Sequence, residues 1–135
     1  MRKIFRNVEL YRANEPDLCK KVYTSEELER ACANTVFPIA ILDMPVNSEF
    51  DFVLDDAIGA CSDFRLVNNA LLCDVLLFAD DETMSDLKKK HNKEALFLTP
   101  IFTLNEKGEA DGIDGVFFGN FLKMETPPVN YMIED

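Results

Sequence analysis

The residue best suited to proton transfer in this chain is its single histidine, His91, in the run KKKHNKE. A hydroxyl or thiol nucleophile needs a neighbouring base to take its proton, and histidine is the usual base because its pKa lies near neutrality. His91 stands at helical spacing from Met84 and Leu87, which predicts a place at the end of a helix, where a cation is favourable. A single histidine also excludes a multi-histidine metal site.

Carboxylates are numerous, and three acidic runs could be imagined around a hard cation: residues 55–56, 80–82 and 111–115. None matches the ligand order of a calcium-binding loop, which alternates oxygen donors around a glycine and closes with a glutamate. We therefore expect solvated turns, with Gly112 and Gly115 as turn residues. No GxxxxGK[ST], GxGxxG or GxSxG motif is present. The sequence thus predicts neither a metal nor a cofactor site.

The four cysteines are Cys19, Cys32, Cys61 and Cys73. They lack the paired CxxC spacing of zinc sites and redox couples. Reduced cysteine commonly behaves as a small core residue, so we expect free and mostly buried thiols.

Length and charge set the broad class of protein. With 135 residues, 47% of them hydrophobic, the chain can form one domain over residues 1–135, with residues 125–135 as a C-terminal tail. The net charge of −11 disfavours binding to nucleic acid and to anionic membranes. No apolar run is long enough for a membrane span or a secretory signal, which predicts synthesis in the cytoplasm.

The first half of the chain predicts two strands around a helix. Residues 3–12 alternate imperfectly and suit a strand with Ile4, Val8 and Leu10 on one side. The run Thr24-Ser25-Glu26-Glu27 has the form of a capping box and predicts a helix over residues 25–34. Residues 37–42 are continuously apolar, which is typical of a strand covered on both faces.

The second half predicts a hairpin, a helix and two further strands. Residues 57–66 and 71–78 flank an asparagine pair that favours a tight reversal. A helix should begin near the acidic run 80–82, followed by strands over 95–104 and 112–124. We therefore predict an α+β fold, a mainly antiparallel sheet or partly closed barrel with two short helices.

The tail contains Pro127-Pro128, which cannot continue a strand ladder, and then an apolar group of three residues. This group, Tyr131, Met132 and Ile133, either docks on the body of the protein or is a candidate anchor for a partner.

The order of these elements resembles the head-maturation (prohead) proteases of tailed bacteriophages, whose fold is related to the herpesvirus assembly proteases. The resemblance spans roughly residues 20 to 130. It depends on the order of elements and on short signatures, which are Tyr23-Thr24, LDMP at 42–45, DAIGACSDFRLVNNALLCDVLLF at 56–78, LTPIF at 98–102, VFF at 116–118 and PPVN at 127–130.

The resemblance implies a catalytic histidine at or beside Met44 and a serine nucleophile near Thr99. Methionine cannot accept a proton, so the implied dyad lacks its base. A threonine hydroxyl without a base is a poor nucleophile at neutral pH. Met44 is equally well explained as a loop residue that packs on the core.

These observations predict a non-catalytic virion or head-assembly protein that binds capsid or scaffold proteins, found in the host cytoplasm at synthesis and then in the virion. One alternative is an active processing peptidase in which His91 or Lys93 activates Thr99. Another is a small acidic phage-encoded inhibitor of a host protein, whose carboxylates would mimic a nucleic acid.

Overall fold

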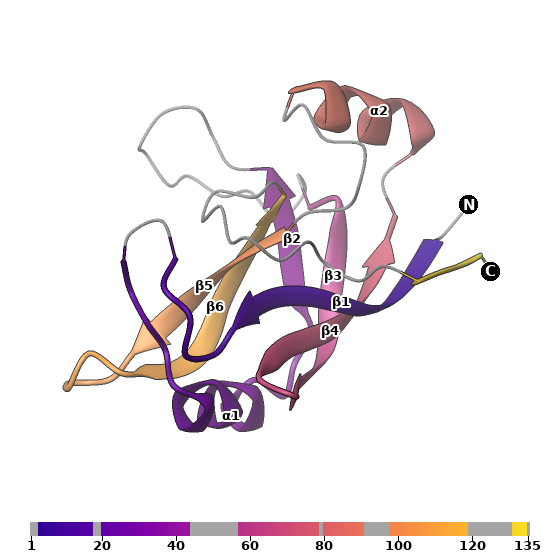
Figure 1. The fold of residues 1–135 in the computed structure, drawn as a ribbon. Coiled ribbons are helices and arrows are strands. Elements are labelled where there is room, and N and C mark those ends of the chain that lie inside the picture. Colours follow the sequence, from indigo (N-terminus) through magenta and orange to yellow (C-terminus); the bar gives the residue numbers. More distant parts are fainter. Residues whose placement is uncertain are drawn as a thin grey trace.

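The computed structural model describes residues 3–17, 20–43, 57–78, 80–90, 98–118 and 131–134. These residues form seven strands and two helices, with α1 after the first strand and α2 after the fourth (Figure 1). The elements are β1 (Lys3–Arg12), α1 (Ser25–Asn34), β2 (Ile39–Asp43), β3 (Gly59–Val67), β4 (Ala70–Leu77), α2 (Asp81–Lys90), β5 (Leu98–Leu104), β6 (Ala110–Phe118) and β7 (Tyr131–Glu134).

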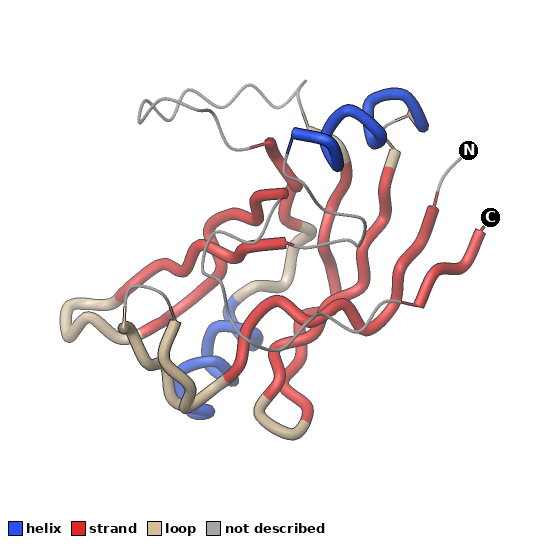
Figure 2. Tube along the Cα trace, turned by 45° about the horizontal axis from the view of Figure 1, so that its top comes forward, coloured by secondary structure: helices blue, strands red, loops and turns tan. Residues whose placement is uncertain are grey.

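The strands form one seven-stranded sheet in the order β5-β6-β2-β3-β4-β1-β7. Only the contact between β2 and β6 is parallel among these neighbours, and the sheet curls into a half-barrel (Figure 2). The helices lie at opposite ends of the sheet, with α1 packed against β6 and β3 (Figure 1). The predicted α+β class, with a mainly antiparallel sheet and two short helices, is confirmed.

The hairpin of β3 and β4 follows from its two asparagines. Asn68 and Asn69 have φ values of 50° and 66°, in the left-handed region that a tight two-residue turn requires. Asparagine adopts this region at lower cost than most residues. The turn fixes the register next to it, so that Val67 lies opposite Ala70, and a shift of register between Ser62 and Arg65 then brings Gly59 opposite Leu77.

Both helices begin at capping side chains. The Thr24 hydroxyl accepts a hydrogen bond from the Glu27 amide at 3.2 Å, as the capping box predicts, and α1 then buries Leu28 and Ala31. At the start of α2, Asp80 accepts from the Thr83 amide at 2.7 Å. Hydrogen bonding from the Thr83 side chain and backbone lowers the pKa of Asp80.

Aromatic rings bridge the two sides of the half-barrel where β1 approaches β5. Phe102 of β5 packs edge-on against Tyr11 of β1, with ring centroids 5.4 Å apart. Tyr23, in the connection before α1, completes the group at 4.8 Å from Phe102 and 5.5 Å from Tyr11. We call this group the aromatic seam, because side-chain packing joins the two strands here.

Three local predictions are wrong. Ile4 does not share a side with Val8 and Leu10, because a shift of register after Phe5 places Ile4 opposite Leu76, on the other face of β4 from the buried Cys73 that lies opposite Val8. Phe37 lies outside β2, since Pro38 has no backbone N–H to donate and the strand begins after it. Residues 111–115 are not turns but part of β6. Asp111 and Asp114 stand at two shifts of register, where neither has a residue opposite it on β5.

Candidate functional site

Thr99, the implied nucleophile position, lies inside β5 directly opposite Phe117 of β6. The residue is 3% exposed. A nucleophilic hydroxyl must meet both its base and the substrate, so the group needs access to an open cleft. Burial in a paired strand opposes that role.

The other residues of the implied dyad, Met44 and His91, lie outside the described residues, as does Lys93. The proposed loss of the base therefore stays a prediction. The structure describes the backbone of the candidate anchor in the C-terminal tail. Tyr131, Met132 and Ile133 form β7, and their backbone pairs with β1 from Ile4 to Arg6. This pairing favours the docked alternative for these residues, and their use as a partner anchor stays a prediction.

The feature that the structure adds is the junction between α1 and β6. Strand β2 pairs with β6 only from Val116 to Phe118, so the earlier part of β6 has no strand on that side. Side chains of α1 take its place. Arg30 donates two hydrogen bonds to the carbonyl of Ala110, at 3.0 and 3.2 Å. The Asn34 amide donates to the carbonyl of Asp111 at 2.8 Å.

Thr35 completes this junction just after the helix. Its hydroxyl donates to the Ala31 carbonyl at 2.7 Å and accepts from the Ile113 amide at 3.0 Å. The Thr35 amide itself bonds to the carbonyl of Cys32, so the hydroxyl supplies the donor that Ala31 would otherwise receive from the backbone. The end of α1 is thereby fixed against the sheet.

An open groove of about 390 Å³ lies beside this junction. Its lining comes from the end of α1, the connection to β2, and the hairpin of β5 and β6. The lining residues are Asn34, Thr35, Val36, Phe37, Ile39, Thr103, Asp111, Gly112 and Ile113. Glycine at position 112 keeps the two strands of the hairpin close, because a Cβ there would lie 2.7 Å from the Thr103 hydroxyl oxygen.

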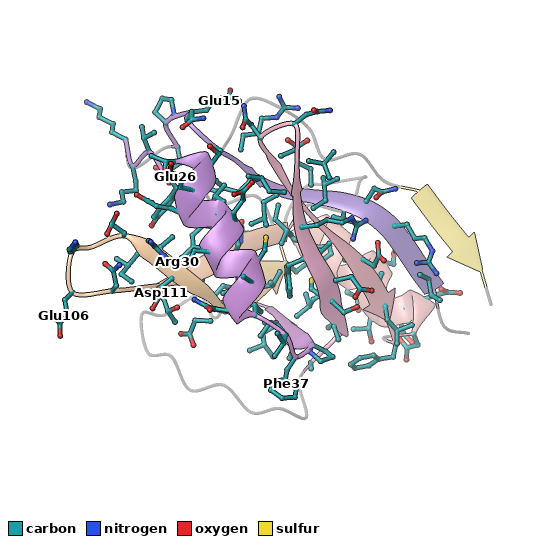
Figure 3. All side chains as sticks on the ribbon, turned by 90° about the horizontal axis from the view of Figure 1, so that it is seen from below. Glu15, Glu26, Arg30, Phe37, Glu106 and Asp111 are labelled. Carbon is teal, nitrogen blue, oxygen red and sulfur yellow. The ribbon has the colours of Figure 1, made fainter. Side chains whose placement is uncertain are left out.

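The groove has an exposed apolar rim. Val36 is 75% exposed and Phe37 is 77% exposed, the highest values among the large hydrophobic residues of the described chain. Phe37 projects from the chain beyond the end of α1 (Figure 3). Exposed apolar side chains beside a groove are typical of a binding surface. Sequence reasoning missed this rim, although Pro38 signals that Phe37 precedes the strand.

The elements around the groove are acidic. Together α1 and the segment from β5 to β6 carry seven carboxylates and two basic residues, a formal charge of −5. One of the two bases, Arg30, lies 3.7 Å from the Asp111 carboxylate and beside it in Figure 3. Among the residues that line the groove only Asp111 is charged, so most of this negative charge lies on α1 and on the hairpin of β5 and β6 outside the groove lining.

Cys32 of α1 lies close to Cys73 of the sheet, which in turn lies beside Cys61, but these three thiols are not suited to chemistry. Cys61 and Cys73 are fully buried, and Cys32 is partly buried. Burial is the main cause that raises the pKa of Cys32 to about 11 and that of Cys61 well above its usual value. A thiol that stays protonated is a poor nucleophile. The prediction of free thiols is confirmed for these three, whereas Cys19 lies outside the described residues.

A second polar cluster lies on the outer face of the sheet around Asp74 of β4. Its carboxylate accepts from Arg6 at 3.2 Å and from Arg65 at 3.0 Å, on the strands to either side. Asn7 and Asp63, with φ values of 57° and 55°, mark irregular positions in those strands. Such irregularities re-aim side chains, and here they bring both guanidinium groups to one carboxylate.

Within the described ranges, no three or more histidine, cysteine or acidic side chains gather in a way that could hold a metal ion. None of the described helices has the length and apolar character needed to cross a membrane. No protein-family model, curated protein or solved structure matches this chain.

Proposed function

We propose that this chain is a non-catalytic binding component of a larger protein assembly, and that the assembly is the head of a tailed bacteriophage. The phage setting comes from the resemblance in the order of elements to the prohead proteases. The binding role depends on one structural observation: the groove at the end of α1 has an exposed apolar rim formed by Val36 and Phe37.

The burial of Thr99 supports a role without catalysis. The groove does not include Thr99, and its lining on β5 is limited to Thr103. The hydroxyl implied as nucleophile is therefore separate from the groove and from its exposed apolar rim. A protein with this arrangement binds at one place and retains the former nucleophile position as part of its core.

Particle composition tests the phage setting. Phage particles would be purified from infected cultures by density gradient, and the chain quantified in them by mass spectrometry against a major head protein. We expect a fixed ratio of the chain to that protein across independent preparations. Absence from both finished particles and purified proheads would contradict the proposal.

Peptidase activity is tested on the purified chain with a hydroxyl-directed fluorophosphonate reagent and with unfolded phage head proteins as substrates. We expect neither labelling nor cleavage, and the same result for the Thr99→Val variant. Cleavage by the native chain that Thr99→Val abolishes would instead establish the processing peptidase.

A further inference from the structure

We infer that Asp17 and Lys21, in the connection between β1 and α1, form a latch that holds the half-barrel closed at the aromatic seam. The seam joins β1 to β5 through the rings of Tyr11, Tyr23 and Phe102, without backbone pairing between the two strands. Separation of β1 from β5 at the seam follows release of the latch. This device belongs to the fold itself and does not depend on the proposed function.

Asp17 ties a buried ring of the seam to the connection that follows β1. Tyr11 is 1% exposed, and its hydroxyl donates to one oxygen of the Asp17 carboxylate at 2.8 Å. The other carboxylate oxygen accepts from the Lys21 amide at 3.0 Å, and the Asp17 amide donates to the Lys21 carbonyl at 3.1 Å. Hydrogen bonds to an ionised group are about twice as strong as neutral ones. One carboxylate therefore joins the Tyr11 ring to a closed turn of the connection.

Lys21 ties the same turn to the other side of the half-barrel. Its ammonium donates to the carbonyl of Gly108, in the turn between β5 and β6, at 3.3 Å. The ammonium also lies over the ring of Tyr23, 5.2 Å from the ring centroid. Tyr23 in turn packs against Phe102 of β5. The latch thus reaches from β1, through Asp17 and Lys21, to the hairpin of β5 and β6.

The latch is more accessible to water than the seam that it holds. Lys21 is exposed and Asp17 is half-buried, so water can replace their hydrogen-bonding partners, whereas the Tyr11 ring is almost fully buried. Local opening of a protein begins where hydrogen bonds are exposed to solvent and apolar contacts are few. The latch should therefore release first, and the rings should separate after it.

Three variants test the latch. Asp17→Ala removes the bond to Tyr11, and the loss of a hydrogen bond to a charged group should raise the open fraction by about tenfold or more. Lys21→Met removes the ammonium but keeps a long side chain, and the loss of an exposed cation from a ring should raise the open fraction about threefold. Glu15→Ala is the control, because it removes another carboxylate of the same connection, which lies 3.9 Å from Arg12.

Nitration by tetranitromethane measures the exposure of the Tyr11 ring, and peptide mass spectrometry separates Tyr11 from the other two tyrosines. We expect the nitration rate of Tyr11 to rise at least about tenfold in Asp17→Ala, about threefold in Lys21→Met and less than about twofold in Glu15→Ala. The reagent attacks the phenolate, which the loss of a nearby cation disfavours, so faster nitration in Lys21→Met reports exposure and not charge.

Amide hydrogen exchange along β3 and β4 shows whether the opening is local, and we expect it to be unchanged in all three variants. Three results would overturn the inference. The first is an unchanged nitration rate of Tyr11 in both latch variants, since the seam would then stay closed without the latch. The second is an equal rise in Glu15→Ala. The third is exchange along β3 and β4 that rises by the same factor as nitration, since the whole fold would then be opening.

Discussion

Replacing Thr35 by valine tests how α1 is held against the sheet. The valine side chain has nearly the shape of the threonine side chain but can neither donate nor accept a hydrogen bond. The variant therefore removes the bond to the Ala31 carbonyl, at 2.7 Å, and the bond from the Ile113 amide, at 3.0 Å, with little change of volume.

The expected cost follows from the burial of the groups that are left. Ile113 is 5% exposed, so its amide would lose its acceptor in a place that water reaches poorly. A buried donor deprived of its acceptor costs about 1–3 kcal/mol, and we expect Thr35→Val to lower the free energy of unfolding by that amount. Thr35→Ser keeps the hydroxyl and loses one methyl group, which should cost no more than about 0.8 kcal/mol.

Urea denaturation followed by circular dichroism measures both variants, with equal slopes required for the comparison. Amide hydrogen exchange at Ile113 gives a local measurement, and exchange should become faster in Thr35→Val but not in Thr35→Ser. A valine variant within about 0.5 kcal/mol of the native chain, or a serine variant as unstable as valine, would refute the reasoning.

Three further predictions concern charge, packing and pH. Asp74→Ala should lower the free energy of unfolding by about 1–3 kcal/mol, and the loss should shrink in 1 M NaCl; a loss that ignores salt would contradict the ionic explanation. Gly59→Ala should cost about 1–3 kcal/mol in the same denaturation assay, because its Cβ would lie 2.5 Å from the Leu76 carbonyl oxygen, whereas Gly115→Ala, with no atom within 4 Å, should be nearly neutral. Because the pKa of Cys32 is raised from 9.0 to about 11, its contribution to stability is complete below pH 9 and is lost as the pH rises toward 11. The midpoint temperature of thermal unfolding should therefore fall more steeply between pH 9 and 11 in the native chain than in Cys32→Ala. Parallel curves of that temperature against pH would contradict the pKa shift.

Much of the fold could be predicted because its signals are local. The capping box at Thr24 fixes the start of α1, and the pair Asn68-Asn69 fixes the turn between β3 and β4. Each signal depends on the conformational preference of a few neighbouring residues. The bounds of α1 match the prediction for this reason.

The errors occur where distant residues decide the outcome. Residues 111–115 contain two aspartates and two glycines, a composition typical of turns. Pairing with β5 and hydrogen bonds from α1 nevertheless hold them in a strand. The groove was also missed, because its two walls come from segments about 70 residues apart in the sequence, and no local pattern links them.

The aromatic seam has a consequence for motion. Rings join β1 to β5 at this place, with centroids 4.8–5.5 Å apart, whereas paired backbone joins the neighbouring strands of the sheet. Separating the rings would expose apolar surface without breaking any backbone hydrogen bond between β1 and β5, because these two strands are not paired. The half-barrel can therefore open locally between β1 and β5 at a lower cost than between paired strands, and the sheet on each side of the opening keeps its backbone hydrogen bonds.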